Sequence, residues 1–139
     1  YTFNGIQYAD QYPGSRFNTL KNNIFVNGVS LHWYSPDLPH NTTSNYNLLP
    51  QTVAVSANKV SYTTLSSWQQ KSQMDAKSLQ GTPVFVGGSA PSKISDFALS
   101  STSPGYKKAS DGTNMGARID KVGVARTVSA NPLPLDFIN

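Results

Sequence analysis

Three short apolar phrases in the second half of the chain constrain its fold most, at residues 82–88, 96–99 and 103–106. Each consists of a few apolar residues bounded by Gly, Pro or Ser, and this pattern predicts a very short strand between turns. Strands this short do not make a stable meander alone, but they are stable when each one stacks on a neighbouring coil of the same chain. The pattern therefore predicts a solenoid, and more specifically the end of one.

The composition is typical of a β-rich extracellular protein. The chain has 139 residues, which fits a single domain, and 37% of them are hydrophobic, which is enough for a core. Charged residues make up only 13%, so neutral hydrogen-bonding groups dominate the expected surface, and such a surface suits contact with sugars. No apolar run approaches the ~20 residues of a membrane span. We expect one secreted domain over residues 1–139 with no membrane partner.

The charged residues narrow the function classes. The net charge of +4 reflects scarce acids rather than a basic stripe, so we expect no nucleic-acid partner. A mildly positive surface instead suits an anionic polysaccharide. The absence of cysteine excludes disulfides and zinc sites with sulfur ligands, and we expect no metal site. All seven acids are Asp, and no two of them lie closer than nine positions apart, so the sequence offers no evidence of the carboxyl pair that glycosidases use.

Asparagines recur at a regular distance in the first half of the chain. Asn23 and Asn47 each stand just before two apolar residues and lie 24 positions apart, a spacing that is typical of stacked repeats. Residues 17–28 predict a strand, a bend at the two asparagines and a second strand. Asn tolerates the left-handed backbone of a bend, and its amide can hydrogen-bond to the equivalent Asn of the next coil. We therefore predict an asparagine ladder, with an ordinary Asn-rich turn as the alternative.

The spacing of the apolar residues changes in the middle of the chain. Residues 53–62 predict two strands joined by a turn, and apolar residues then recur near helical spacing. Thr63 or Thr64 is a suitable N-cap for one short helix near residues 65–72. We expect Trp68 to pack this helix on the side of the solenoid as a core residue rather than as a sugar platform.

The order of these phrases is more specific than any one of them. It runs NNIF at 22–25, SNYNLL at 44–49, TLSSWQ at 64–69, SLQGTPVFV at 78–86, DFAL at 96–99, SPGY at 103–106 and GTNMGA at 112–117. In this order, over about residues 17–123, the chain resembles the C-terminal coils of right-handed parallel β-helix proteins of the pectate-lyase-like superfamily. The resemblance implies an all-β solenoid of about four terminal coils, and we expect residues 122–139 to form an extended capping tail.

The same resemblance implies a carbohydrate-active protein. The superfamily includes polysaccharide lyases, glycoside hydrolases, epimerases, phage tailspikes and adhesins, and the fold alone does not choose among them. Its polygalacturonase-like members carry an adjacent Asp pair that this sequence lacks, whereas its lyases use a Lys, Arg or His base, with calcium or polar groups neutralising the uronate carboxylate. We therefore expect part of a polysaccharide lyase that acts on an acidic glycan, with calcium as a cofactor that the resemblance allows. The alternative is a non-catalytic carbohydrate-binding or self-assembling structural protein.

A loop at residues 30–41 concentrates the first group of candidate site residues. It holds both histidines of the protein, and its side chains suit proton transfer, ion binding or stacking on sugar rings. The candidates for catalysis are His32 and His40, and those for substrate binding are Trp33, Tyr34 and Asp37. The alternative is a long loop whose aromatic rings fold back onto the coil. Asn41 begins a glycosylation acceptor sequence, which has meaning only in a eukaryotic secretory context.

Basic residues outside this loop give further candidates. Lys21, a further candidate for catalysis, precedes the asparagine pair and can face outward onto a sugar groove, and Arg118 and Lys121 follow the last phrase. Each has an ordinary solvated charge as its alternative. The N-terminal strand does not look like a cap, so we expect missing N-terminal coils, a partner chain or an identical subunit to cover that face. Because the sequence begins at Tyr1 rather than Met, we also expect an upstream segment to be missing.

Overall fold

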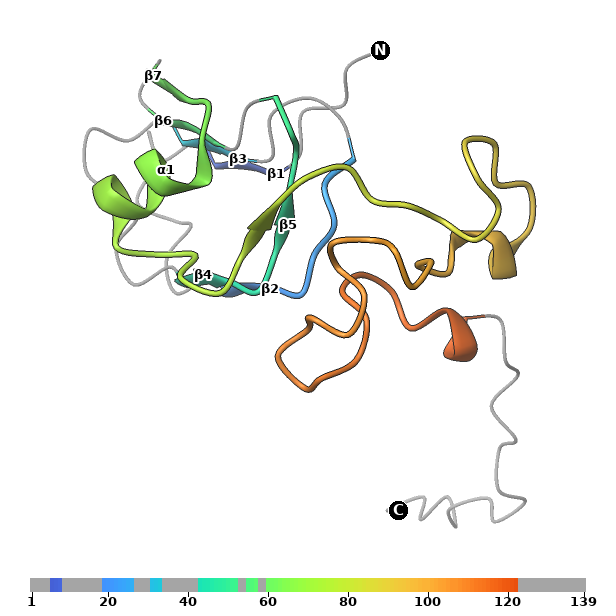
Figure 1. The fold of residues 1–139 in the computed structure, drawn as a ribbon. Coiled ribbons are helices and arrows are strands. Elements are labelled where there is room, and N and C mark those ends of the chain that lie inside the picture. Colours follow the sequence, from blue (N-terminus) through green and yellow to red (C-terminus); the bar gives the residue numbers. More distant parts are fainter. Residues whose placement is uncertain are drawn as a thin grey trace, which may run out of the picture.

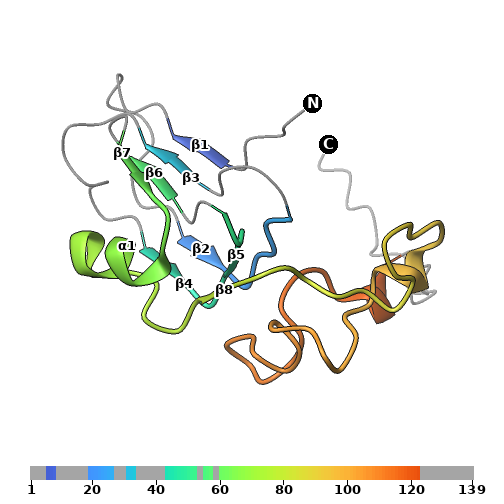
Figure 2. The ribbon, with the colours of Figure 1, turned by 45° about the horizontal axis from the view of Figure 1, so that its top comes forward.

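Short strands in three small sheets dominate the computed structural model, which describes residues 6–8, 19–26, 31–33, 43–52, 55–57 and 60–122. The first sheet contains β1 (Ile6–Tyr8), β3 (Leu31–Trp33), β6 (Val55–Ala57) and β7 (Val60–Tyr62) in that order, side by side in Figure 2. The second contains β2 (Thr19–Lys21) and β4 (Thr43–Asn45), and the third contains β5 (Leu48–Leu49) and β8 (Leu79–Gln80). Figure 1 shows the three sheets facing one another around a common interior.

Three parallel pairings share one offset, whereas β1 and β3 pair Ile6 with Leu31 at an offset of 25 residues. Thr19 lies opposite Thr43 in β2–β4 at an offset of 24 residues, and the same offset joins Ile24 to Leu48 and His32 to Ser56. The chain therefore visits the three sheets in the same order on successive passes. The offset rises to 31 residues between Asn47 and Ser78, because the β6–β7 hairpin and the helix α1 (Leu65–Ser72) enlarge this pass.

The predicted asparagine ladder is confirmed and extends to a third rung. The backbone N–H and the side-chain Nδ2 of Asn23 both donate to Oδ1 of Asn47, each over 3.0 Å. The backbone N–H of Asn47 donates in turn to Oγ of Ser78 over 2.9 Å. The left-handed residues of the corners are Asn22 (φ 61°) and Tyr46 (φ 56°), which precede the ladder residues instead of coinciding with them.

The two residues of β5 serve two separate cores. Adjacent strand residues point to opposite faces, and Leu48 and Leu49 are both fully buried. Leu49 packs with Leu20, Val55 and Trp68 between the sheets. Leu48 packs on the other side with residues of the C-terminal segment, a name we use for residues 82–122. The third sheet is therefore covered on both faces.

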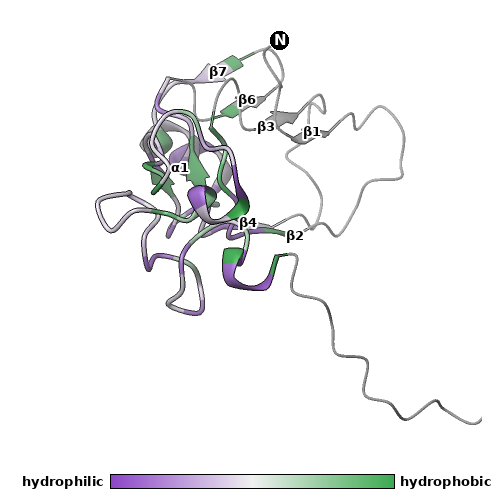
Figure 3. Ribbon diagram, turned by 90° about the vertical axis from the view of Figure 1, so that its right-hand side faces the viewer, coloured by the Kyte–Doolittle hydropathy of each residue, from purple (hydrophilic) through white to green (hydrophobic). Residues whose placement is uncertain are grey.

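The helix α1 forms where the sequence predicts it. Thr64 is its N-cap and accepts a hydrogen bond from the backbone N–H of Ser67 over 3.2 Å. Trp68 is fully buried and meets the Tyr62 ring edge-on at 5.5 Å, which confirms its assignment to the core. Figure 3 places α1 next to β7 at the end of the stacks, opposite to β1, rather than along their side as predicted.

A buried carboxylate anchors the turn after α1. Asp75 is fully buried, and its carboxylate accepts hydrogen bonds from the hydroxyl of Ser44 over 2.9 Å, from the hydroxyl of Ser78 over 2.5 Å and from Nε1 of Trp68 over 2.9 Å. Buried charges are tolerated when donors surround them in this way. Asp75 therefore joins β4, α1 and the third rung of the ladder.

The strand prediction is wrong for two of the three C-terminal phrases. Residues 103–106 form a turn in which the N–H of Tyr106 donates to the carbonyl of Ser103, and Pro104 at its second position favours that turn over a strand. A 3-10 helix, η1 (Ile94–Phe97), occupies the first half of the 96–99 phrase. Residues 84–86 pair antiparallel with residues 98–100 and do not stack on a coil. A second 3-10 helix, η2 (Ile119–Lys121), ends the described chain, and the predicted tail beyond Val122 lies outside the described residues.

Among the described residues, no helix is long and apolar enough to cross a membrane.

Candidate functional site

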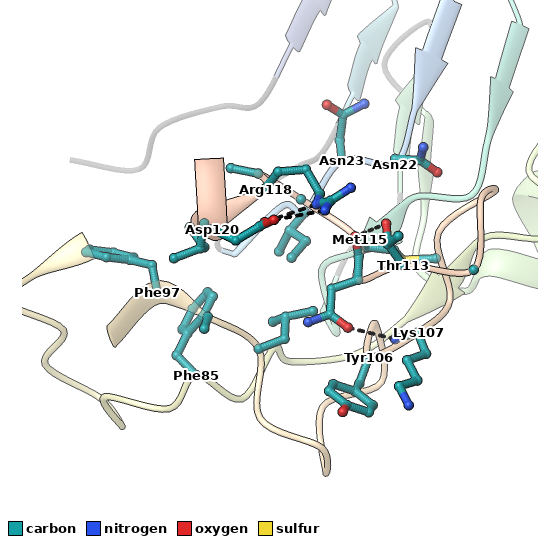
Figure 4. Close-up of a pocket in the computed structure, with 18 of the residues that line it drawn as sticks. Asn22, Asn23, Phe85, Phe97, Tyr106, Lys107, Thr113, Met115, Arg118 and Asp120 are labelled. Atoms are coloured by element: carbon teal, nitrogen blue, oxygen red, sulfur yellow. Dashed lines mark hydrogen bonds and ion pairs between the residues drawn. The ribbon is translucent and has the colours of Figure 1, made fainter. Parts of the chain in front are cut away.

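A groove of about 970 Å³ lies between the corner that follows β2 and the C-terminal segment. The corner supplies the wall from Lys21 to Ile24 together with Val26, and the C-terminal segment supplies the rest (Figure 4). Two parts of the chain that are far apart in sequence therefore form this site together.

Asn22 attaches the corner to the C-terminal segment. Its left-handed backbone turns its side chain outward, where Oδ1 accepts from the backbone N–H of Ser110 over 2.9 Å and Nδ2 donates to the Ser110 hydroxyl over 3.1 Å. The carbonyl of Asn22 also accepts from the N–H of Gly116 over 2.7 Å. Gly116 has a φ of +84°, and a Cβ there would stand 2.8 Å from Cδ1 of Ile24, so this close approach requires glycine.

Three cations line the groove. Lys21 comes from β2, whereas Lys107 and Arg118 come from the C-terminal segment. The Lys107 ammonium lies 5.5 Å from the centroid of the Tyr106 ring, and Arg118 pairs with Asp120 over 2.9 Å. Within the described ranges, neither lysine has a carboxylate partner. The groove therefore has an excess of positive charge.

The acidic side chains near the groove are held in their charged forms. The hydrogen bond from the Arg118 guanidinium lowers the pKa of the Asp120 carboxyl below its ordinary value of 3.8. A hydrogen bond from the Thr113 hydroxyl to Asp111, over 2.7 Å, likewise lowers the pKa of that carboxyl. The ion pair raises the pKa of Arg118. These charges are therefore present throughout the neutral pH range.

Aromatic rings form the other side of the groove. Phe85 and Phe97 meet edge-on with their centroids 6.1 Å apart, and Figure 4 shows them across the opening from Tyr106 and Lys107. Phe97 is 48% exposed, which is unusual for a side chain of this size and hydrophobicity. An aromatic surface beside free cations suits a ligand that has both ring faces and negative charges.

A smaller hollow of about 210 Å³ lies on the outer face of β2 and β4. Thr19, Thr43 and Asn45 line it with neutral polar groups, and Lys21 lines both this hollow and the groove. Lys21 therefore stands at the junction of the two.

The structure brings together two of the candidates proposed from the sequence. Lys21 and Arg118 line the same groove, whereas Lys121 lies in η2 and does not line it. His32 and Trp33 belong to β3, and their side chains are not described. The remaining loop candidates lie outside the described residues: Tyr34, Asp37, His40 and the glycosylation candidate Asn41.

Sequence reasoning missed Lys107, Tyr106 and the two phenylalanines as site residues. The adjacent lysines at 107 and 108 are the one local signal of positive charge in this part of the sequence. The phenylalanines looked like strand core, and only the antiparallel pairing of their segments places them at the opening. In the described part of the chain, no three His, Cys, Asp or Glu side chains gather as metal ligands would.

Comparison with known proteins gives no match: no family model, no curated protein and no solved structure resembles this chain significantly. The chemistry therefore has to be argued from the groove itself. Among the described residues that line it, Asp120 is the single carboxylate, and Arg118 already occupies it. Hydrolysis by a carboxylate pair has no basis in this groove, whereas binding of an anion by Lys21 and Lys107 does.

Proposed function

We propose that this chain is a secreted module that binds an acidic polysaccharide in the groove between the Asn22 corner and the C-terminal segment. One observation carries the proposal. Lys21 and Lys107, which lack carboxylate partners among the described residues, line one groove with exposed aromatic rings. Carboxylate or sulfate groups of a glycan pair with the lysines, and sugar rings stack on the aromatic side.

Binding to polysaccharides of different charge tests this proposal directly. We expect retention of the chain by polygalacturonate and none by a neutral glucan, with retention falling as salt screens the charges. Lys107→Gln should weaken binding about 10-fold, since a charged hydrogen bond is lost. Lys108→Gln is the matched control, because Lys108 is exposed and does not line the groove. Equal effects of the two substitutions would show that only net charge matters and would overturn the groove as the site.

We propose that the fold is the terminal part of a right-handed parallel β-helix of the pectate-lyase-like superfamily. The offset of 24 residues in β2–β4, in β3–β6 and between Ile24 and Leu48, together with the Asn23–Asn47–Ser78 ladder, supports this proposal, because equivalent residues recur at a fixed interval in stacked repeats. An experimental structure in which the strands of successive passes do not stack would contradict it.

Within this fold we propose that the chain is part of a polysaccharide lyase. Lys107 can neutralise a uronate carboxylate in the groove, which leaves Lys21 as the candidate base. The loop candidates His32 and His40 are the alternative bases. Incubation with uronate polymers should release unsaturated products that absorb in the ultraviolet. Lys21→Gln should abolish this release if Lys21 is the base. His32→Gln or His40→Gln should do so instead if the loop acts.

A self-assembling structural module is the second candidate function. The ladder supports it, because Oδ1 of Asn23, the equivalent of the Asn47 acceptor, receives no hydrogen bond in the described part of the chain. Another coil, from an identical subunit, a partner chain or N-terminal coils, can supply the missing N–H. Light scattering that detects only monomers at every concentration would contradict self-assembly, whereas filaments without any turnover would support it over the lyase.

A further inference from the structure

Tyr46 has an unusual backbone conformation for an aromatic residue. Its φ of 56° is left-handed, and the equivalent residue 24 positions earlier is Asn22, with a φ of 61°. Asn adopts this conformation with little strain, whereas a residue with a bulky side chain rarely does. The fold therefore accepts strain at Tyr46 that the residue type at the equivalent corner avoids. Strained backbone conformations of this kind are retained where the side chain has a functional role.

The Tyr46 ring lies against the ammonium group of Lys21. Nζ of Lys21 stands 5.7 Å from the ring centroid, within the range of a cation–π contact. Lys21 is the cation that the groove and the outer hollow of β2 and β4 share. The Tyr46 ring thus holds the long, flexible side chain of Lys21 at the junction between the groove and the hollow.

The hollow beyond this junction has the chemistry of a neutral sugar site. The hydroxyls of Thr19 and Thr43 lie 3.4 Å apart on its floor. Oδ1 of Asn45 accepts from the backbone N–H groups of Tyr46 and Lys77, and its Nδ2 has no acceptor among the described residues, so it is available to a ligand in the hollow. Hydroxyl and amide groups of this kind hydrogen-bond to sugar hydroxyls.

We propose that the groove and the hollow form one continuous path across Lys21, so that the ligand is an oligosaccharide with at least one unit on each side. This inference rests on the proposed binding of an acidic polysaccharide. Lys21 holds an anionic group at the junction, Asn45 binds the unit in the hollow, and Tyr46 is a positioning residue that acts through Lys21.

Affinity as a function of oligomer length tests the path. Titration calorimetry with galacturonate oligomers should show affinity rising from the monomer to the longer oligomers. Asn45→Ala should remove this rise, because the contacts to the unit in the hollow are lost. Lys107→Gln, as the contrasting variant within the groove, should weaken all lengths alike. Affinity that does not depend on length would overturn the path alone, whereas no binding of any acidic saccharide would overturn the proposed function as well.

Two substitutions at Tyr46 distinguish a positioning role of this residue from a purely structural one. Tyr46→Asn introduces the residue type found at the equivalent corner, so the folded backbone should persist. The affinity for oligomers should fall on the order of 5-fold, because the ring that holds Lys21 is lost. Tyr46→Phe keeps the ring and should restore the affinity. The salt dependence of binding should also weaken in Tyr46→Asn, because Lys21 is no longer held at the ligand. A Tyr46→Asn variant that folds and binds as the parent does would overturn the positioning role, as would loss of binding in Tyr46→Phe.

Discussion

Asn23 and Asn47 are joined by two hydrogen bonds to one acceptor: the backbone N–H and the side-chain Nδ2 of Asn23 both donate to Oδ1 of Asn47. Asn47 is fully buried, and its own Nδ2 lies within 3.1 Å of both the carbonyl of Leu20 and the hydroxyl of Ser44. Nδ2 of Asn47 also donates to Oδ1 of Asp75 over 3.4 Å, so this one side chain bonds to both neighbouring passes. The stacking of the strands of successive passes therefore depends on the side-chain amide of Asn47.

Asn47→Ala should destabilise the protein by about 2–3 kcal/mol, because it leaves buried donors and acceptors without partners. Urea denaturation followed by circular dichroism measures the change as a lower midpoint with an unchanged slope. Gln70→Ala serves as the control, since Gln70 is an exposed residue of α1. Equal stability of the two variants would contradict a structural role for the ladder.

Asp75→Asn should cost about 3 kcal/mol although the side chain keeps its size. Both carboxylate oxygens accept from donors, so the new NH₂ group must face either the serine hydroxyls or Nε1 of Trp68. Thermal unfolding of Asp75→Asn, Trp68→Phe and the double variant tests this. The double variant should lose less than the sum of the single losses, because both changes remove the same hydrogen bond. Additive losses would show that the two residues act independently.

Gly116→Ala should destabilise the protein more than Gly112→Ala does. Both glycines have positive φ, at +84° and +76°, so alanine is strained at either position by about 1 kcal/mol. A Cβ at residue 112 meets nothing within 4 Å, whereas one at residue 116 collides with Ile24. We expect the collision to add about 1 kcal/mol or more. The difference in unfolding free energy between the variants isolates this contact, and no difference would show that the C-terminal segment does not pack on Ile24.

Asp111 and Asp120 should both titrate below pH 3.8 in the folded protein, because hydrogen bonds from Thr113 and from Arg118 stabilise their charged forms. A carboxyl whose pKa is lower in the folded than in the unfolded state stabilises the fold above its unfolded pKa. This contribution is lost as the pH falls through the folded pKa. Carboxyl carbon chemical shifts measured by NMR give both midpoints. In Arg118→Gln the midpoint of Asp120 should rise toward 3.8, while Asp111, held mainly by Thr113, should shift less.

Local patterns were sufficient to predict the ladder and the helix. The 24-residue interval between two asparagines and the cap at Thr64 are short-range features, and both recur in the structure. The C-terminal phrases were predicted less well, because a few apolar residues between Gly and Pro are compatible with strand, turn or 3-10 helix alike. Their conformation depends on the pairing of residues 84–86 with residues 98–100, and no local pattern encodes this pairing.

The candidate site was predictable only in part for the same reason. Lys21 stood out from its place before the asparagines, but nothing near Lys107 in the sequence indicates that it shares a groove with Lys21. Their proximity depends on the hydrogen bonds of Asn22 to Ser110 and Gly116. Contacts between such distant positions are a property of the tertiary fold.

The link between Asn22 and Ser110 spans 88 residues, so one wall of the groove is synthesised long before the other. A nascent chain that has emerged only as far as β8 can stack its strands but has no groove, and formation of the groove waits until the C-terminal segment docks. The same dependence holds during proteolysis. Cleavage between β8 and Ser110 would separate the two walls of the groove even if the stacked strands stayed folded. The proposed ligand binding therefore depends on a chain that is uncut between β2 and the C-terminal segment.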